Sequence, residues 1–237
     1  MKPNQTPAEE SKRNAALEAV KHVKNWNIVG LGSGSTAALA IEALGERVKH
    51  ENLNILAIPS SYQAFQLATE WRIPVTTLEE HPIIDITIDG ADQITPELNL
   101  IKGNGAAQTT EKVVAVATKQ NIIIADETKK VKTLGENNQP VPIEVLPFAL
   151  GLVKRKITEL GGKPTLRETK GKVGPVISDN GNLIMDANFG TIISPADLQT
   201  KLKAIPGIIE TGLFIDLTDI AYIGTPTGTE RTEKQRK

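Results

Sequence analysis

Residues 28–37 read IVGLGSGSTA, a short apolar run that breaks into a series of small residues. The apolar part predicts a buried strand, and the glycines let the backbone turn and approach a ligand closely. A helix is expected from Thr36 to Lys49, and the free N–H groups at its start would attract an anion. The stretch therefore predicts a strand–turn–helix unit that can hold a phosphate group.

Two other interpretations of this turn stay open. From Gly32 the residues follow the pattern G-x-G-x-x-A of dinucleotide-binding turns. The next expected strand, 53–58, runs into Pro59-Ser60-Ser61, however, rather than into an acidic residue that could hold a ribose. The turn could also only join a strand to a helix, with Ser and Thr as caps. A small phosphate-bearing ligand fits these residues best.

Alternating strands and helices continue through the first half of the chain. We expect helices at 9–24, 36–49, 62–71 and 107–118, and strands at 28–32, 53–58, 84–88 and 121–125. Strands that alternate with helices of this length indicate a mostly parallel sheet flanked by helices. Ligands of such sheets bind beyond the carboxyl ends of the strands.

The pattern changes near Leu134, after which Pro, Asn and Gly become frequent. We expect a strand at 141–145, helices at 149–160 and 195–204, and a hairpin that joins 173–178 to 183–186 through Asn180-Gly181. Residues 134–207 are therefore predicted to form a small α+β, ferredoxin-like insertion. Residues 1–133 and 208–237 are predicted to form a Rossmann-like catalytic domain, with a returning strand in 212–223 and a frayed polar tail after Thr225.

Composition excludes several classes of protein. The 237 residues contain no cysteine, so disulfides, thiolate metal sites and a cysteine nucleophile are excluded. The formal net charge of -1 gives no general attraction to nucleic acid or to a membrane surface. No apolar run approaches the roughly 20 residues of a membrane span, and the polar N-terminus is unlike a secretion signal. A cytoplasmic protein without nucleic-acid or membrane partners is expected.

Three more polar or glycine-rich segments follow expected strands. They are Asp89-Gly90-Ala91-Asp92, Lys102-Gly103-Asn104-Gly105 with Glu111 farther on, and Asp126-Glu127-Thr128-Lys129. Each has an ordinary structural alternative: an Asp-Gly turn, a glutamate that complements a helix dipole, or a solvated surface lysine. Because the carboxyl ends of parallel strands share one edge of the sheet, we expect the segments to gather there.

The gathered groups favour one kind of chemistry. They supply an anion cradle, carboxylates and two lysines, whereas the spacing of His22, His50 and His81 matches no metal-binding motif. A carboxylate can remove a carbon-bound proton, and cations with N–H groups can stabilise the oxyanion that results. The residues therefore favour proton transfer beside a carbonyl of a phosphorylated sugar.

Seven segments together resemble the ribose-5-phosphate isomerase family of type A. They are GLGSGSTA at 30–37, DGADQI at 89–94, KGNGAA at 102–107, IADETK at 124–129, PVPIEVLPFA at 140–149, SDNGNLIMDANFG at 178–190 and IPGIIETGLF at 205–214. The resemblance covers nearly the whole chain. It implies interconversion of ribose 5-phosphate and ribulose 5-phosphate through a cis-enediolate, without a cofactor or metal, by a cytoplasmic homodimer.

The resemblance also implies roles for individual residues. Glu111 is expected to be the general base that moves a proton between carbons 1 and 2. Asp89 is expected to help open the sugar ring, Lys102 to stabilise the enediolate, and Asp92 to hold substrate hydroxyls. The other expected substrate-binding residues are Lys12, Ser33, Gly34, Ser35, Thr36, Gly90, Ala91, Gly103, Asn104, Gly105 and Lys129. Asn104 replaces a common glycine, and asparagine tolerates the left-handed backbone that such a loop can need.

Two alternatives to this function stay open. A sugar-phosphate sensor would bind the ligand without turnover, but the first helix is expected almost at the start of the sequence, so no DNA-binding segment is expected. Another sugar-phosphate isomerase or a lactonase on a related scaffold would be expected to use a histidine. The segments singled out above contain none.

Overall fold

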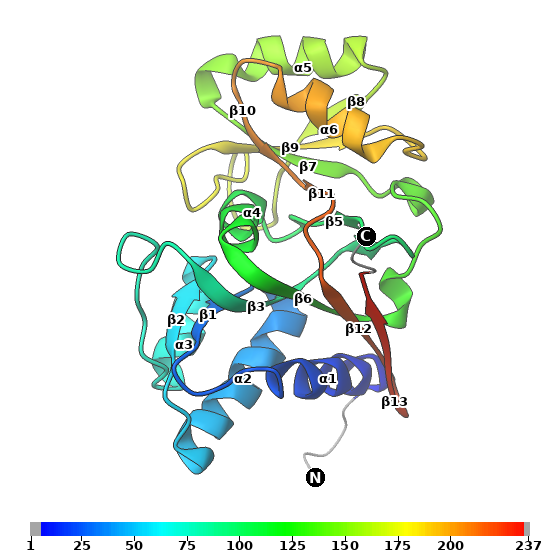
Figure 1. Cartoon of the computed structure of the whole chain (residues 1–237). Helices are drawn as coiled ribbons and strands as arrows, with labels where there is room; N and C mark the ends of the chain where they lie inside the picture. Colours follow the sequence, from blue (N-terminus) through cyan, green and yellow to red (C-terminus); the bar gives the residue numbers. More distant parts are fainter. Residues whose placement is uncertain (1–5, 235–237) are drawn as a thin grey trace. The chain divides into compact units, whose positions relative to one another are not determined.

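The computed structural model describes residues 6–234 and divides the chain into two compact units (Figure 1). Unit 1 contains the residues up to Ala91, Thr110–Lys130, and the residues from Leu217 onward. Unit 2 contains Asp92–Thr109 and Val131–Asp216. The chain thus passes from unit 1 to unit 2 twice, once after Ala91 and once after Lys130.

Unit 1 is built on a six-stranded sheet in the order β13-β12-β6-β3-β1-β2. Its strands are β1 (Ile28–Leu31), β2 (Leu56–Pro59), β3 (Ile84–Gly90), β6 (Thr118–Asp126), β12 (Ile220–Thr225) and β13 (Gly228–Glu233). The first five strands pair in parallel and only β13 runs antiparallel. The apolar runs are continuous rather than alternating because helices cover both faces of a parallel sheet. The mostly parallel, Rossmann-like sheet is confirmed.

Helices α1 (Pro7–Val20), α2 (Gly34–Glu51) and α4 (Gln108–Val116) flank this sheet, and α3 (Tyr62–Glu70) follows β2. Figure 1 shows α1 and α2 on one face and α4 on the other. Helix α1 begins at residue 7 rather than 9 because Thr6 and Glu9 form a reciprocal capping box and Pro7 occupies the first turn. Its Ala15, Ala19 and Val20 join the main apolar core of the unit.

The tail after Thr225 is not frayed, which corrects the expectation drawn from its polarity. Residues 228–233 form β13, and their register with β12 runs from Thr225↔Gly228 to Ile220↔Glu233. Glu230 pairs with Lys130 over 2.7 Å. Polar and charged side chains are typical of an edge strand, whose outer side faces water. Residues 235–237 lie outside the described part of the chain.

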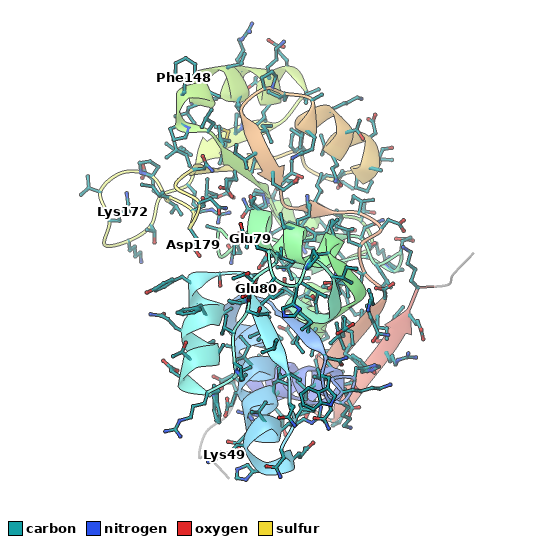
Figure 2. The ribbon with its side chains drawn as sticks, turned by 60° about the vertical axis from the view of Figure 1, so that its left-hand side comes forward. Lys49, Glu79, Glu80, Phe148, Lys172 and Asp179 are labelled. Carbon is teal, nitrogen blue, oxygen red and sulfur yellow. The ribbon has the colours of Figure 1, made fainter. Side chains whose placement is uncertain are left out.

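Unit 2 contains two sheets. Strands β7 (Val141–Val145), β8 (Lys163–Leu166), β9 (Leu183–Asn188) and β10 (Ile208–Thr211) form an antiparallel sheet in the order β10-β7-β9-β8. Helix α5 (Leu150–Glu159) joins β7 to β8, and α6 (Pro195–Lys203) joins β9 to β10. This β-α-β-β-α-β succession is the ferredoxin-like arrangement that was expected. Phe148, just before α5, is almost fully exposed (Figure 2).

The expected hairpin in unit 2 is only partly formed. The turn is present, since the Ser178 N–H donates to the Asn182 carbonyl over 2.8 Å. Residues 173–178 do not form a strand, however, and make only isolated bridges such as Ile177↔Leu183. The loop that carries Lys172 (Figure 2) precedes them, and β9 pairs instead with β8, a strand that was not predicted from the sequence.

A second sheet of unit 2 explains why the two units differ from the predicted domain boundaries. Strands β4 (Gln93–Ile94), β5 (Leu100–Ile101) and β11 (Leu213–Phe214) pair in the order β11-β5-β4. Strands β4 and β5 lie in 92–109, and β11 follows β10 (208–211) of the four-stranded sheet, so 92–109 and 208–216 belong to unit 2 although the sequence predicts them in the catalytic domain. Of the returning run 212–223, only 220–223 therefore lies in the sheet of unit 1.

His22 provides a test of how α1 is held on unit 1. Its Nε2 lies 2.7 Å from the Tyr222 hydroxyl of β12, and burial, with a smaller effect of the Arg231 charge, lowers the pKa of the imidazole. The unfolded chain, with a histidine pKa of about 6.5, then binds this proton more readily than the folded chain. We predict that the free energy of unfolding, measured with urea, falls as the pH drops below about 6.5, where the unfolded chain takes up this proton and the folded chain does not yet do so. The fall should be smaller in His22→Gln.

Candidate active site

The carboxyl ends of β1 and β3 form the expected binding edge of unit 1. Strand β1 lies between β2 and β3, so the chain leaves β1 toward one side of the sheet and later returns on the other. Such a point, where the strand order reverses, is where ligands bind to open parallel sheets. Both the glycine-rich turn after β1 and Asp89 near the end of β3 lie here.

The glycine-rich turn packs directly against Asp89. The Gly32 N–H donates to the Ile88 carbonyl over 2.9 Å, and the Ser33 N–H donates to Asp89 Oδ1 over 3.1 Å. A Cβ atom added at Gly32 would lie 2.1 Å from Asp89 Oδ1, so only glycine fits. Gly34 has a φ of 91°, a left-handed conformation that glycine adopts without strain. The turn and Asp89 are therefore one structural element.

Residues that follow β2, in the loop before α3 and in the first turn of α3, also hold this turn. The Ser33 hydroxyl shares a hydrogen bond of 2.9 Å with Ser60 and donates to Ser61 over 2.6 Å. The Gly34 N–H donates to Gln63 Oε1 over 2.8 Å. Ser60, Ser61 and Gln63 were not among the predicted site residues. The signal was present, because Pro59-Ser60-Ser61 ends a parallel strand at the same edge.

Lys12 and the start of α2 supply positive charge to the turn. Lys12 Nζ donates to the Ser35 hydroxyl over 3.2 Å, which links α1 to the first turn of α2. That first turn contains no acidic residue, and Ser33 makes no side-chain cap to it. N–H groups at a helix start, together with an ammonium group, attract a phosphate. Lys12, Ser33, Gly34, Ser35 and Thr36 therefore lie together, as expected.

Asp89 and Gly90 end β3. Asp89 is 3% exposed, and its Oδ1 accepts hydrogen bonds from Ser33 N–H and from Gly90 N–H, the latter over 2.7 Å. Gly90 lies beside the turn, since a Cβ added there would be 3.8 Å from the Ser33 carbonyl oxygen. Ala91 is the next residue, and after it the chain enters unit 2.

Glu111 lies on α4, one turn before Val114. Glu111 is 5% exposed, and Val114 packs over β1, because a Cβ added at Gly30 would lie 2.7 Å from Val114 Cγ1. Residues three apart share one face of a helix, so Glu111 belongs to the face of α4 that packs against the sheet of unit 1. A buried carboxylate on a rigid helix is well suited to act as a base.

Lys129 ends the short 3-10 turn Glu127–Lys129, directly after β6. Asp126 caps this turn, since its Oδ1 accepts a hydrogen bond from the Thr128 N–H over 3.0 Å. Strand β6 pairs with β3, so Lys129 follows the strand next to the one that carries Asp89. The structure therefore places Lys129 at the expected edge of the sheet.

The remaining predicted residues form a compact loop of unit 2. The Asn104 N–H donates to Asp92 Oδ2 over 2.9 Å, and the Lys102 N–H donates to the Gly212 carbonyl over 2.8 Å. Lys102 is 3% exposed, and its Nζ lies 5.4 Å from the centroid of the Phe214 ring. At this distance the ring face attracts the ammonium group. Hydrogen bonds of this one loop thus hold both Asp92 and Lys102 in place.

The backbone of this loop differs in one respect from expectation. Gly103, with a φ of 108°, and Ala106, with a φ of 62°, are its left-handed residues. Asn104 is not among the residues with positive φ, so the tolerance of asparagine for that conformation is not what preserves the turn. Gly103 also leaves no room for a side chain, because an added Cβ would be 2.8 Å from Gln108 Oε1. Gly105 follows Asn104 in the same turn.

The predicted residues thus fall into two groups. Unit 1 brings together Lys12, residues 33–36, Asp89 and Gly90, and it holds Glu111 and Lys129 on neighbouring elements. Unit 2 brings Asp92 together with Lys102–Gly105. Within residues 6–234 no three His, Cys, Asp or Glu side chains gather as a metal site would require, and no helix there is long and apolar enough to cross a membrane.

A parallel sheet that joins a glycine-rich turn to a carboxylate where its strand order reverses defines an α/β protein with a site for a small anionic ligand. Residues 56–228 match the family described as ribose 5-phosphate isomerase A, also called phosphoriboisomerase A. The chain belongs to this family.

Individual relatives agree with the family match. The chain is 49% identical over 217 residues to the ribose-5-phosphate isomerase A of Methanosarcina acetivorans. The matched residues are 92% of this chain and 91% of that protein. The chain is 44% identical over 224 residues to the human ribose-5-phosphate isomerase. The matched residues are 93% of this chain and 72% of that protein.

Solved structures are also similar. A D-ribose-5-phosphate isomerase in complex with phospho-erythronic acid has a TM-score of 0.93 and 43% identity, over 96% of this chain and all (100%) of that one. The ribose 5-phosphate isomerase A of Methanocaldococcus jannaschii has a TM-score of 0.91 and 42% identity, over 95% and 99% of the two chains.

Proposed function

We propose that this protein interconverts D-ribose 5-phosphate and D-ribulose 5-phosphate through a cis-enediolate. The observation that carries the proposal is the family match over 56–228, which includes Asp89, Lys102 and Glu111. The phospho-erythronic acid in the complex of the similar isomerase is a small phosphorylated sugar acid, which supports a phosphorylated sugar as the ligand here. The proposed isomerisation would be one step in the non-oxidative interconversion of pentose phosphates.

The proposed reaction begins at the phosphate. Lys12 and the start of α2 would bind the phosphate group, and Lys129 would contact the distal part of the sugar. Asp89 would move protons between the ring oxygen and hydroxyls so that the sugar opens. The hydrogen bonds that Ser33 and Gly90 donate to Asp89 Oδ1 support this role, because they fix the carboxylate beside the glycine-rich turn.

The carbon-bound proton moves in the second part of the reaction. Glu111 would take the proton from carbon 2 of the open aldose and return it to carbon 1. Negative charge develops on the oxygens of carbons 1 and 2, where Lys102 and the N–H groups of its loop would stabilise it. Asp92 would hold substrate hydroxyls.

The proposal predicts activity without a metal ion. The ammonium of Lys102 supplies the positive charge that a metal would otherwise provide, so we expect unchanged turnover of ribose 5-phosphate after dialysis against EDTA. Turnover that EDTA abolishes and a divalent ion restores would contradict this mechanism.

The homodimer implied by the resemblance also stays a prediction, and sedimentation equilibrium would measure it.

Gly32→Ala tests the contact between the turn and Asp89. The new methyl group would overlap Asp89 Oδ1 and lie 2.5 Å from its Cα, so the carboxylate must shift. Because small displacements of reacting groups reduce rates strongly, we predict a loss of kcat/KM for ribose 5-phosphate of about tenfold or more. Gly151→Ala on α5 is the matched control, since no atom lies within 4 Å of its added Cβ. Equal activity of the two variants would show that the contact is unimportant.

A further inference from the structure

Arg167 follows β8 in unit 2, and its guanidinium group makes four hydrogen bonds. Nε donates to Asp186 Oδ2 over 2.8 Å, and Nη2 donates to Asp186 Oδ1 over 2.5 Å. Nη1 donates to the carbonyl oxygens of Gly103 and Asn104 over 2.8 and 2.9 Å. The Arg167 side chain is only 13% exposed. The guanidinium thus joins β9 to the loop that contains Lys102.

These hydrogen bonds determine which way the loop's N–H groups point. In a trans peptide the C=O and the following N–H point in opposite directions. With the carbonyls of Gly103 and Asn104 turned toward Arg167, the N–H groups of Asn104 and Gly105 are turned away from it. The Asn104 N–H indeed donates to Asp92 Oδ2 on the other side. Arg167 therefore orients two N–H donors of this loop.

The loop needs such support, and only arginine can provide it in this form. Residues 103 and 105 are both glycine, so the free backbone would sample many conformations. The planar guanidinium binds both carboxylate oxygens of Asp186 on one side while it donates to two carbonyls on the other. A lysine ammonium has its three N–H donors on a single nitrogen, so it cannot reach both the carboxylate and the two carbonyls in this planar arrangement. Asp186 is itself fixed, because it pairs with Thr165 across β8 and β9.

We propose that Arg167 is a positioning residue for the isomerase reaction: it holds the Lys102–Gly105 loop so that the Asn104 N–H binds the Asp92 carboxylate and the Gly105 N–H is directed toward the substrate. The inference rests on the proposed function, in which this loop stabilises the enediolate. Arg167 does not touch the substrate in this account. It acts through the backbone of Gly103 and Asn104, and Asp186 keeps its guanidinium in the required plane.

The test compares Arg167→Ala, Arg167→Lys and the control Arg155→Ala. Arg155 is an exposed arginine of α5 that pairs with Glu159 over 3.4 Å, so its removal makes the same change in charge. A group that acts on transition-state charge changes kcat rather than KM. We expect kcat for ribose 5-phosphate to fall about tenfold in both Arg167 variants, in proportion to a few lost hydrogen bonds, with KM nearly unchanged. Arg155→Ala should match the wild type.

Chemical rescue separates positioning from a general effect on folding. Millimolar guanidinium chloride should restore part of the activity of Arg167→Ala with saturation, but should not change Arg167→Lys or Arg155→Ala. Amide hydrogen exchange should become faster at residues 103–106 in both Arg167 variants. Wild-type kcat in Arg167→Ala, or a loss that guanidinium does not restore, would overturn the inference. An inactive wild-type protein would instead overturn the proposed function, and the inference with it.

Discussion

Glu111→Gln should lower kcat for ribose 5-phosphate by at least about 100-fold, the lower part of the range for a lost general base. Glutamine has nearly the same size as glutamate, so the packing of α4 should be preserved, but its amide cannot accept the proton from carbon 2. KM should change little, because the phosphate and hydroxyl contacts involve other residues. Steady-state rates and a urea unfolding curve would measure both effects.

Two further variants make this test specific. Glu111→Asp keeps a carboxylate but withdraws it by one methylene, so it should keep more activity than Glu111→Gln. Glu70→Gln changes the same charge at an exposed position at the end of α3 and should have wild-type activity. Near-normal turnover by a folded Glu111→Gln protein would show that another group is the base.

Lys102→Met should cost about 100- to 1,000-fold in kcat, the magnitude found when one stabilising group is removed from a developing oxyanion. Lys102 is almost fully buried beside Phe214, so its charge acts with little screening by water. Methionine fills much of the same space without the charge. Lys102→Arg should not restore activity, because the planar guanidinium has a different size and donor geometry.

The control for Lys102 is Lys154→Met, which removes an exposed lysine of α5 and should leave kcat unchanged. Thermal unfolding of both variants would separate catalysis from stability. A rise in KM with an unchanged kcat in Lys102→Met would place this lysine in substrate binding and not in stabilisation of the enediolate.

The parallel sheet and its binding edge could be predicted from the sequence because their signals are local. Three of the four apolar runs, such as 84–88, are followed directly by a glycine or an aspartate, and the fourth is followed by Pro59-Ser60-Ser61. The order of strands then brings those ends to one edge without any knowledge of side-chain contacts. Glu111 was placed correctly on a helix for the same reason, since α4 follows a glycine turn that marks its start.

Contacts between distant segments could not be predicted in this way. The two-residue strands β4, β5 and β11 are too short to show a period, and only their pairing reveals them. Arg167 gave no signal, because its partners Asp186 and Gly103 are 19 and 64 residues away. Ser60 and Ser61 were visible at a strand end, but their contact with Ser33 depends on the neighbouring position of β1 and β2.

The polar C-terminal strand was misjudged for a different physical reason. Low hydrophobicity predicts a frayed tail, whereas β13 needs only one paired side to be stable. Its hydrogen bonds to β12 and the Glu230–Lys130 ion pair hold it in place.

The central claim is that Glu111 carries a proton between carbons 1 and 2, and isomerisation in D₂O tests it most directly. A carboxylate that holds this proton can exchange it with solvent, so the ribulose 5-phosphate formed should carry deuterium on carbon 1, detected by NMR or mass spectrometry. Glu111→Gln should form no such labelled product at a comparable rate. Unlabelled product from D₂O, together with complete transfer of deuterium from carbon 2 of labelled ribose 5-phosphate, would show a hydride shift and contradict the account.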